Sequence, residues 1–72
     1  MLSGKRFQLR KPTIAIETTD SGRGAVMVDS GDVVKVISGP RPGDQMLEVL
    51  WNGRVVVMFA IDVQSRGEEV PD

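Results

Sequence analysis

Residues Met46–Ala60 have the sequence M-L-E-V-L-W-N-G-R-V-V-V-M-F-A, and this stretch decides the fold. Two runs rich in β-branched and large apolar residues flank the dipeptide Asn52-Gly53. A type I′ turn requires φ > 0 at both of its central positions, which asparagine tolerates and glycine adopts freely. The stretch therefore predicts a β-hairpin with a two-residue turn.

The predicted hairpin is apolar on both of its faces. A two-residue turn pairs Trp51 with Arg54 and, further out, Leu47 with Met58. One face then carries Leu47, Val49, Trp51, Val56 and Met58, and the other carries Met46, Leu50, Val55, Val57 and Phe59, interrupted by Glu48. An ordinary antiparallel hairpin is apolar on one face only, so the second face needs a cover. Two covers are open: the N-terminal strand with Phe7 and Leu9, or a second copy of the chain.

The rest of the chain predicts short strands between turns. Outside the hairpin, the predicted strands are Lys5–Arg10, Ile14–Thr19, Ala25–Val28, Val33–Ile37 and, at the C-terminal edge, Arg66–Val70. A 3₁₀ turn is predicted at Ile61–Ser65, and no longer window has a helical period. In 72 residues, this pattern predicts a single all-β domain, a closed barrel of about five antiparallel strands. Residues 1–12 form its basic N-terminal strand or arm, and residues 66–72 an acidic tail.

Composition excludes several classes of site. The chain has no cysteine and no histidine, which removes disulfides, the usual zinc ligands and Ser-His or Cys-His catalysis. Asp29, Asp32 and Asp44 lack the spacing of an EF-hand and are interpreted as turn formers. No apolar run approaches the ~20 residues of a membrane span, and no signal-peptide core follows the first residues. We expect a non-catalytic cytoplasmic protein without cofactor, metal, membrane contact or small-molecule substrate.

Charge is distributed unevenly along the chain. The net charge is −1, yet residues 1–16 carry four basic side chains and no acidic one, and residues 17–72 carry five basic and ten acidic ones. The basic side chains near the N-terminus are Lys5, Arg6, Arg10 and Lys11. Such a basic arm either meets an anionic partner or lies along the acidic body of its own chain.

Three segments resemble the latter half of an SH3-like barrel: Gly31–Ile37, Leu50–Arg54 and Met58–Val63. That family has the same elements in the same order: a G-D-x-apolar strand, a loop, an N-G hairpin and an F-P-x-x-apolar 3₁₀ turn. The resemblance implies the fold but not the polyproline groove of the family. Tyrosine is absent from the chain, and Ala60 stands where the groove has its proline.

Within the segment Gly31–Gly43, the run Ser30–Pro40 closely resembles the opening of a KOW motif, S-G-D-V-V-K-V-I-S-G-P. That family also uses a small SH3-like barrel, and its loop after this strand contacts RNA or protein. The resemblance implies contact residues at Lys35, Arg41 and Arg54. The later glycine of the motif falls at Met46, and the acidic body contrasts with the basic footprint of nucleic-acid-binding domains.

The chain is also similar in length to plasmid-borne type II dihydrofolate reductase, another SH3-like barrel. The V-Q-I-Y strand of that enzyme falls on Val56–Phe59. The glutamine and tyrosine on which its chemistry relies are Val57 and Phe59 here, so the resemblance does not imply that activity.

Two groups of residues are candidates for binding. Trp51 and Arg54 at the hairpin tip form either a recognition patch or a cross-strand cation–π pair that supports the turn. With Lys35 and Arg41 they make up the candidate interaction surface, and the basic arm is the second candidate. The leading hypothesis is a macromolecule-binding domain whose partner is another protein or, by self-association, a second copy. The alternative is a KOW-like module that binds RNA in a ribosomal or transcription context.

Overall fold

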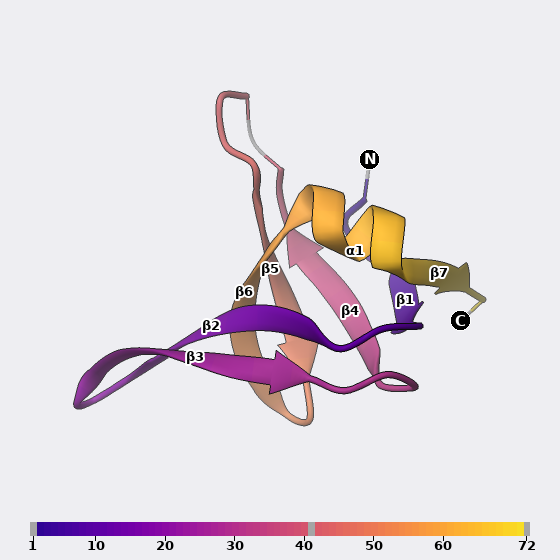
Figure 1. Ribbon diagram of the computed structural model, residues 1–72. Helices are drawn as coiled ribbons and strands as arrows, with labels where there is room; N and C mark the ends of the chain where they lie inside the picture. The colour runs from indigo at the N-terminus through magenta and orange to yellow at the C-terminus, as the bar shows by residue number, and fades with distance from the viewer. Residues whose placement is uncertain (1, 41, 72) are drawn as a thin grey trace.

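The structure is a computed structural model that describes residues 2–40 and 42–71. Within this part of the chain, seven strands form one antiparallel sheet with a short helix against it (Figure 1). The elements are β1 (Arg6–Leu9), β2 (Thr13–Thr19), β3 (Gly22–Val28), β4 (Val33–Ser38), β5 (Met46–Trp51), β6 (Arg54–Phe59), α1 (Ala60–Arg66) and β7 (Gly67–Val70). Their order in the sheet is β3-β2-β6-β5-β4-β1-β7. The all-β prediction is therefore confirmed.

The hairpin of β5 and β6 has the predicted turn and register. Asn52 has φ 51° and Gly53 has φ 76°, the positive values that a type I′ turn requires. Trp51 pairs with Arg54, and the ladder continues without a shift to Met46 opposite Phe59. The Asn-Gly dipeptide thus sets which side chains of the two strands share a face.

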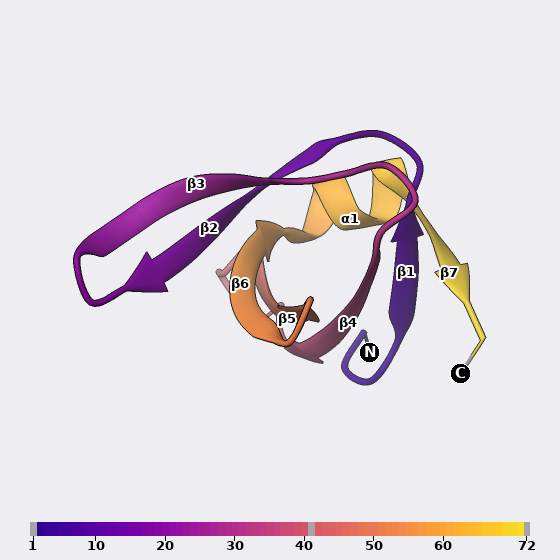
Figure 2. The same ribbon diagram turned by 90° about the horizontal axis from the view of Figure 1, so that it is seen from below.

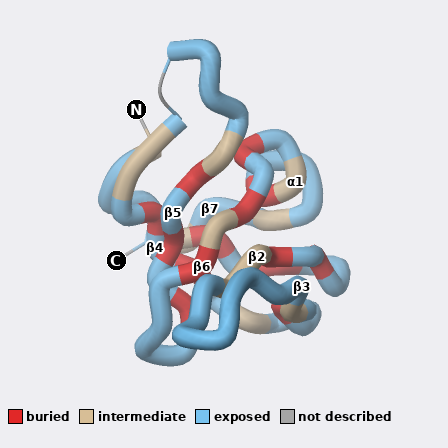
Figure 3. Tube along the Cα trace, turned by 90° about the vertical axis from the view of Figure 1, so that its left-hand side faces the viewer, coloured by how far each residue is buried: buried red, intermediate tan, exposed pale blue. Residues whose placement is uncertain are grey.

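The core lies on one face of this hairpin. Of the two predicted faces of β5 and β6, the one with Leu47, Val49, Trp51, Val56 and Met58 is buried throughout, and Figure 3 shows the alternation of buried and exposed positions along the strands. The other buried apolar side chains are Phe7, Leu9, Ala15, Val28, Val34, Val36, Ala60 and Val63. Each large apolar side chain contributes about 1.5–3 kcal/mol on burial, so this single cluster provides most of the driving force for folding.

The N-terminal strand does not cover the second face of the hairpin. β1 pairs with β4, where Phe7 lies opposite Val34, and both Phe7 and Leu9 belong to the core. On the second face, Leu50 is 41% exposed and Val55 is 51% exposed. Of the two covers left open, the N-terminal strand is therefore the wrong one, because register places the apolar side chains of β1 on the inner side.

The sheet differs from the predicted barrel in strand number and closure. It has seven strands rather than about five among the described residues, and it is open, with β3 at one edge and β7 at the other. β3 begins at Gly22 rather than Ala25, because Gly22 and Gly24 extend the ladder opposite β2. Glycine weakens a strand without excluding it, so the predicted strand Ala25–Val28 begins three residues too late.

A helix replaces the predicted 3₁₀ turn. α1 spans Ala60–Arg66 and buries Ala60 and Val63, which lie three residues apart on one helical face. Asp62 in the first turn and Arg66 in the last turn complement the helix dipole, and their side chains approach to 4.0 Å. In the described part of the chain, this helix is too short to cross a membrane.

The hairpin of β2 and β3 projects from the rest of the sheet. β2 meets β6 at one register pair, Ile16 opposite Val57, whereas β2 and β3 pair along their whole length. Figures 1 and 2 show the turn of this hairpin extending away from the other strands in two perpendicular views. The turn end of the edge strand β3 thus lies away from the core, whereas its other end, at Val28, is buried in the core.

Candidate functional site

Trp51 and Arg54 form a structural pair at the tip of the central hairpin. The Arg54 guanidinium lies 5.2 Å from the centroid of the Trp51 ring, and the Trp51 residue is only 7% exposed. The pair therefore has the geometry of a cross-strand cation–π contact. A ring that is covered in this way is not available to stack on a base or to fill a pocket of a partner.

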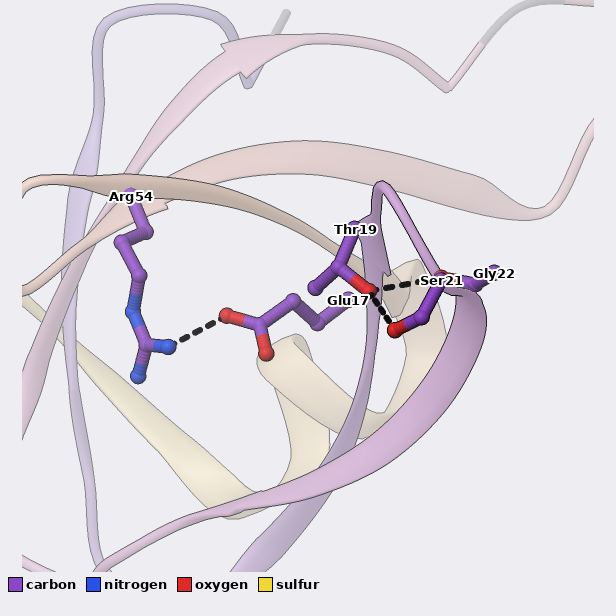
Figure 4. A network of polar contacts seen from close by, with 5 residues as sticks. All are labelled: Glu17, Thr19, Ser21, Gly22 and Arg54. Atoms are coloured by element: carbon purple, nitrogen blue, oxygen red, sulfur yellow. Dashed lines mark hydrogen bonds and ion pairs between the residues drawn. The ribbon is translucent and has the colours of Figure 1, made fainter.

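Polar contacts extend from this pair to two other parts of the fold, β2 and the turn before β4. Arg54 forms an ion pair with Glu17 of β2, as Figure 4 shows. On the other side, Trp51 Nε1 donates a hydrogen bond of 3.0 Å to Oδ2 of Asp32, in the turn before β4. A separate hydrogen bond lies in the turn of the projecting hairpin, where Thr19 Oγ1 is 3.0 Å from Ser21 Oγ (Figure 4).

Glu17 and Asp32 were not among the candidate site residues. The signal for Asp32 is its place in the G-D step before β4, where a carboxylate follows a turn glycine. Glu17 gives no such signal, because its position opposite Arg54 depends on the long-range pairing of β2 with β6. The cluster is structural: all four side chains have partners inside the chain, and the described residues contain no group that could hold a metal ion.

The basic arm lies along the acidic edge strand of the same chain. Lys5 Nζ is 3.5 Å from an Oε atom of Glu69, and Arg10 forms an ion pair with Glu68. Lys5 and Arg10 flank β1, and their partners Glu68 and Glu69 belong to β7, which pairs with β1 in the sheet. Much of the arm's charge is thus offset by β7, as expected for a basic segment on an acidic body. Lys11 is exposed beyond the strand.

Lys35 is exposed on the outer face of the sheet. In the register it lies between Arg6 of β1 and Leu50 of β5, so the structure does not bring it to Trp51 and Arg54. The fourth candidate, Arg41, lies outside the described residues. Of the three members of the predicted interaction surface that the structure describes, Lys35 therefore lies apart from Trp51 and Arg54.

The carboxylate of Glu48 is exposed and has a partner on the neighbouring strand. Ser38 Oγ donates a hydrogen bond of 2.6 Å to Glu48 Oε1. A half-open pocket of about 290 Å³ lies beside this contact. Its lining includes Arg23, Ser38, Gly39, Asp44, Glu48 and Val57. Asp44 is engaged as a turn acceptor, since its Oδ1 accepts the backbone N–H of Met46 at 2.9 Å.

The outer face of the sheet is the most extensive surface feature. Of the eight large apolar residues that are exposed in the described part of the chain, seven point outward from the strands. They are Ile14, Met27, Val33, Ile37, Leu50, Val55 and Phe59. Their register places them on the side opposite the core, around the half-buried Ile16, Met46 and Val57. No family model, curated protein or solved structure matches this chain.

Proposed function

We propose that the chain is a non-catalytic domain that binds another protein through the outer face of its sheet. The observation that carries this proposal is the gathering of seven exposed large apolar side chains on one side of the sheet. Single exposed apolar residues are ordinary, whereas a contiguous group marks an interaction surface. With 72 residues, the domain has a small surface, and this face occupies the strands β2 to β6.

The polar residues around this face suit a protein partner. Lys35 lies opposite Leu50, and Glu48 lies between Met46 and Leu50 on β5, so charges of both signs lie among the apolar side chains. Protein interfaces combine apolar side chains with polar and charged ones in this way. Met27 and Val55, which are 52% and 51% exposed, are the most exposed of the seven apolar residues.

RNA binding is the alternative, and two observations weigh against it. Lys5 and Arg10, half of the basic arm, are paired with Glu69 and Glu68. Trp51, the only tryptophan, has its ring covered by Arg54. Binding of single-stranded RNA relies on a basic groove and on exposed aromatic rings, and this chain has little of either.

The proposal also includes the fold family. We infer an open variant of the SH3-like barrel, and the support is the order of a G-D strand, an N-G hairpin, a helical turn and a short final strand. In this variant the β2–β3 hairpin projects rather than folding back to close the barrel. The inner side of the sheet is filled by the core, so binding is assigned to the outer side.

Photo-crosslinking tests the proposal. Benzoylphenylalanine is placed at Leu50 in the full chain, which is expressed in its own organism, and crosslinked proteins are identified by mass spectrometry. The matched control carries the same group at Gln64, which is exposed on α1 and away from the outer face. A protein captured at Leu50 and not at Gln64 is then purified, and its binding to the chain is measured directly.

The expected result is a protein partner whose affinity falls at least tenfold in Leu50→Asp and not in Gln64→Asp, because the aspartate removes the apolar contact of Leu50 and brings a charge that must be desolvated into the interface. Capture of no such protein contradicts the proposal. Binding of RNA oligonucleotides with a log-linear salt dependence, unchanged in Leu50→Asp, supports the alternative instead.

A further inference from the structure

The two edge strands of the sheet, β7 and β3, differ in length, charge and proline content. β7 is four residues long, carries Glu68 and Glu69 and is followed by Pro71. β3 is seven residues long, and Arg23 is its only charged residue. Short length, charges and proline are the means by which sheets protect an edge from pairing with a further strand. β7 has all three, whereas β3 has one charge near its beginning.

The free edge of β3 is open along its length. In the described part of the chain, β3 pairs with β2 alone, and it is the first strand in the sheet order. Residues from Gly22 to Ala25 and Met27 are exposed, and Figure 3 shows most of this strand in pale blue. Because the β2–β3 hairpin projects (Figures 1 and 2), another chain can approach this edge without meeting the core.

The hairpin geometry determines which backbone groups face the open edge. Thr19 and Gly22 flank the turn, and such a flanking pair is hydrogen-bonded across the ladder, as is every second pair after it. Gly22, Gly24, Val26 and Val28 therefore direct their N–H and C=O groups to β2. The backbone groups of Arg23, Ala25 and Met27 point outward, where they are available to a further strand.

We propose that two copies of this chain pair antiparallel through β3, about a twofold axis at Ala25, and form one sheet across the dimer. Ala25 is the middle residue of Gly22–Val28, so this register overlaps the whole of both strands. It opposes Ala25 to Ala25 of the second copy and Arg23 to Met27 of the second copy. Every outward N–H and C=O group of β3 then has a backbone partner.

The side chains of β3 are complementary to themselves in this register. Gly24 lies opposite Val26 of the second copy, and a Cβ at Gly24 would meet nothing within 4 Å, so there is room for the larger side chain. Arg23 lies diagonally from Asp29 of the second copy, within reach of a long side chain on the same face. Asp29 is exposed. The two arginines lie at opposite ends of the paired strands, so they do not repel each other closely.

A second copy fits this edge better than a foreign strand does, because it supplies the small residue, the large residue and the carboxylate at matching positions. A C₂ contact of this kind is self-complementary by symmetry. The proposal does not rest on the proposed function, since it uses the backbone edge of β3 rather than the outer face around Leu50, although Met27 belongs to both.

The mass of the full chain in solution tests this inference. An edge contact buries little area, so sedimentation equilibrium is measured from about 10 μM to about 1 mM, the range expected for small interfaces. The expected result is a rise from the 7.8 kDa monomer toward twice that mass. Ala25→Lys places like charges opposite each other at the twofold axis and is expected to weaken the dimer at least tenfold. Gln64→Lys, with the same charge change on α1, should dimerise like the unmodified chain.

Two further measurements make the test specific. Mixing Ala25→Lys with Ala25→Glu should restore a mass of two chains, because opposite charges then meet at the axis. In the unmodified chain, hydrogen exchange at the amides of Arg23, Ala25 and Met27 should slow as concentration rises; this readout needs no variant to fold. A monomer throughout the range overturns the inference, as does a dimer in which these amides stay unprotected. Loss of dimer in Leu50→Asp alone would assign self-association to the outer face instead.

Discussion

Trp51 and Asp32 are joined by a hydrogen bond of 3.0 Å from the indole Nε1 to a carboxylate Oδ2. Trp51 ends β5, and Asp32 belongs to the turn that precedes β4, so the bond connects neighbouring strands near one end of the sheet. The same carboxylate lies 3.3 Å from the backbone N of Asp29, whose N–H it accepts. The Asp32 carboxylate therefore stabilises both the turn before β4 and the position of the Trp51 ring.

Asp32→Ala should destabilise the fold by about 1–3 kcal/mol, because it leaves the N–H of a largely buried indole without its acceptor. Urea unfolding followed by the fluorescence of Trp51, the only tryptophan, measures the change. Asp20→Ala, in the exposed turn between β2 and β3, is the control and should change the free energy of unfolding by less than about 0.5 kcal/mol. Equal changes in the free energy of unfolding for the two variants would show that the hydrogen bond to Trp51 does not stabilise the fold.

Arg54 and Glu17 should be coupled weakly and in a salt-dependent way. Their side chains are 52% and 18% exposed, so solvent and ions screen the pair. A double-mutant cycle with Arg54→Met and Glu17→Gln should give a coupling free energy of about 0.5–1 kcal/mol at low salt. At about 1 M salt, where the Debye length is about 3 Å, the coupling should fall by half or more. A coupling that does not respond to salt would argue against an ionic origin.

The sequence predicts local structure well and long-range pairing poorly. Asn52 and Gly53 determine their own turn, and that turn fixes the register of β5 and β6 for twelve residues, so the members of each face follow directly. Which of the two faces is the core does not follow from this pattern. The placement of Phe7 and Leu9 depends on the pairing of β1 with β4, which no local pattern specifies, and for this reason the cover of the second face was left open.

Closure of the sheet was mispredicted for a related reason. Glycines at positions 22 and 24 suggest a turn, whereas the ladder with β2 carries them as strand residues. With these residues β3 is long enough to form a projecting hairpin with β2. Because β2 pairs with β6 only at Ile16 and Val57, this hairpin does not close the sheet into a barrel. The candidate site was affected in the same way, because Trp51 and Lys35 lie on opposite faces of the sheet.

Leu47 and Leu50 lie on the same strand and should respond very differently to truncation. Leu47 is 0% exposed and Leu50 is 41% exposed, because residues three apart on a strand point to opposite faces. Leu47→Ala should cost about 2–5 kcal/mol of the free energy of unfolding through lost burial and a cavity. Leu50→Ala should cost less than about 1 kcal/mol. Chemical denaturation of both variants measures the difference, and equal costs would mean that the outer face is buried in solution.

Gly39→Ala should be far more harmful than Gly43→Ala, although both glycines lie between β4 and β5 with positive φ, 96° and 79°. A Cβ at Gly39 would lie 2.7 Å from the backbone oxygen of Met46, whereas a Cβ at Gly43 would meet nothing within 4 Å. Both variants bear the cost of a left-handed conformation, about 1–2 kcal/mol. Gly39→Ala must also displace the backbone at the start of β5, for a total of about 3 kcal/mol or more. Thermal unfolding measures the melting temperatures of both variants, and the difference between them reports the steric clash with Met46 apart from the backbone strain that both share. Equal melting temperatures would show that the loop at Gly39 moves to accept the Cβ without displacing β5.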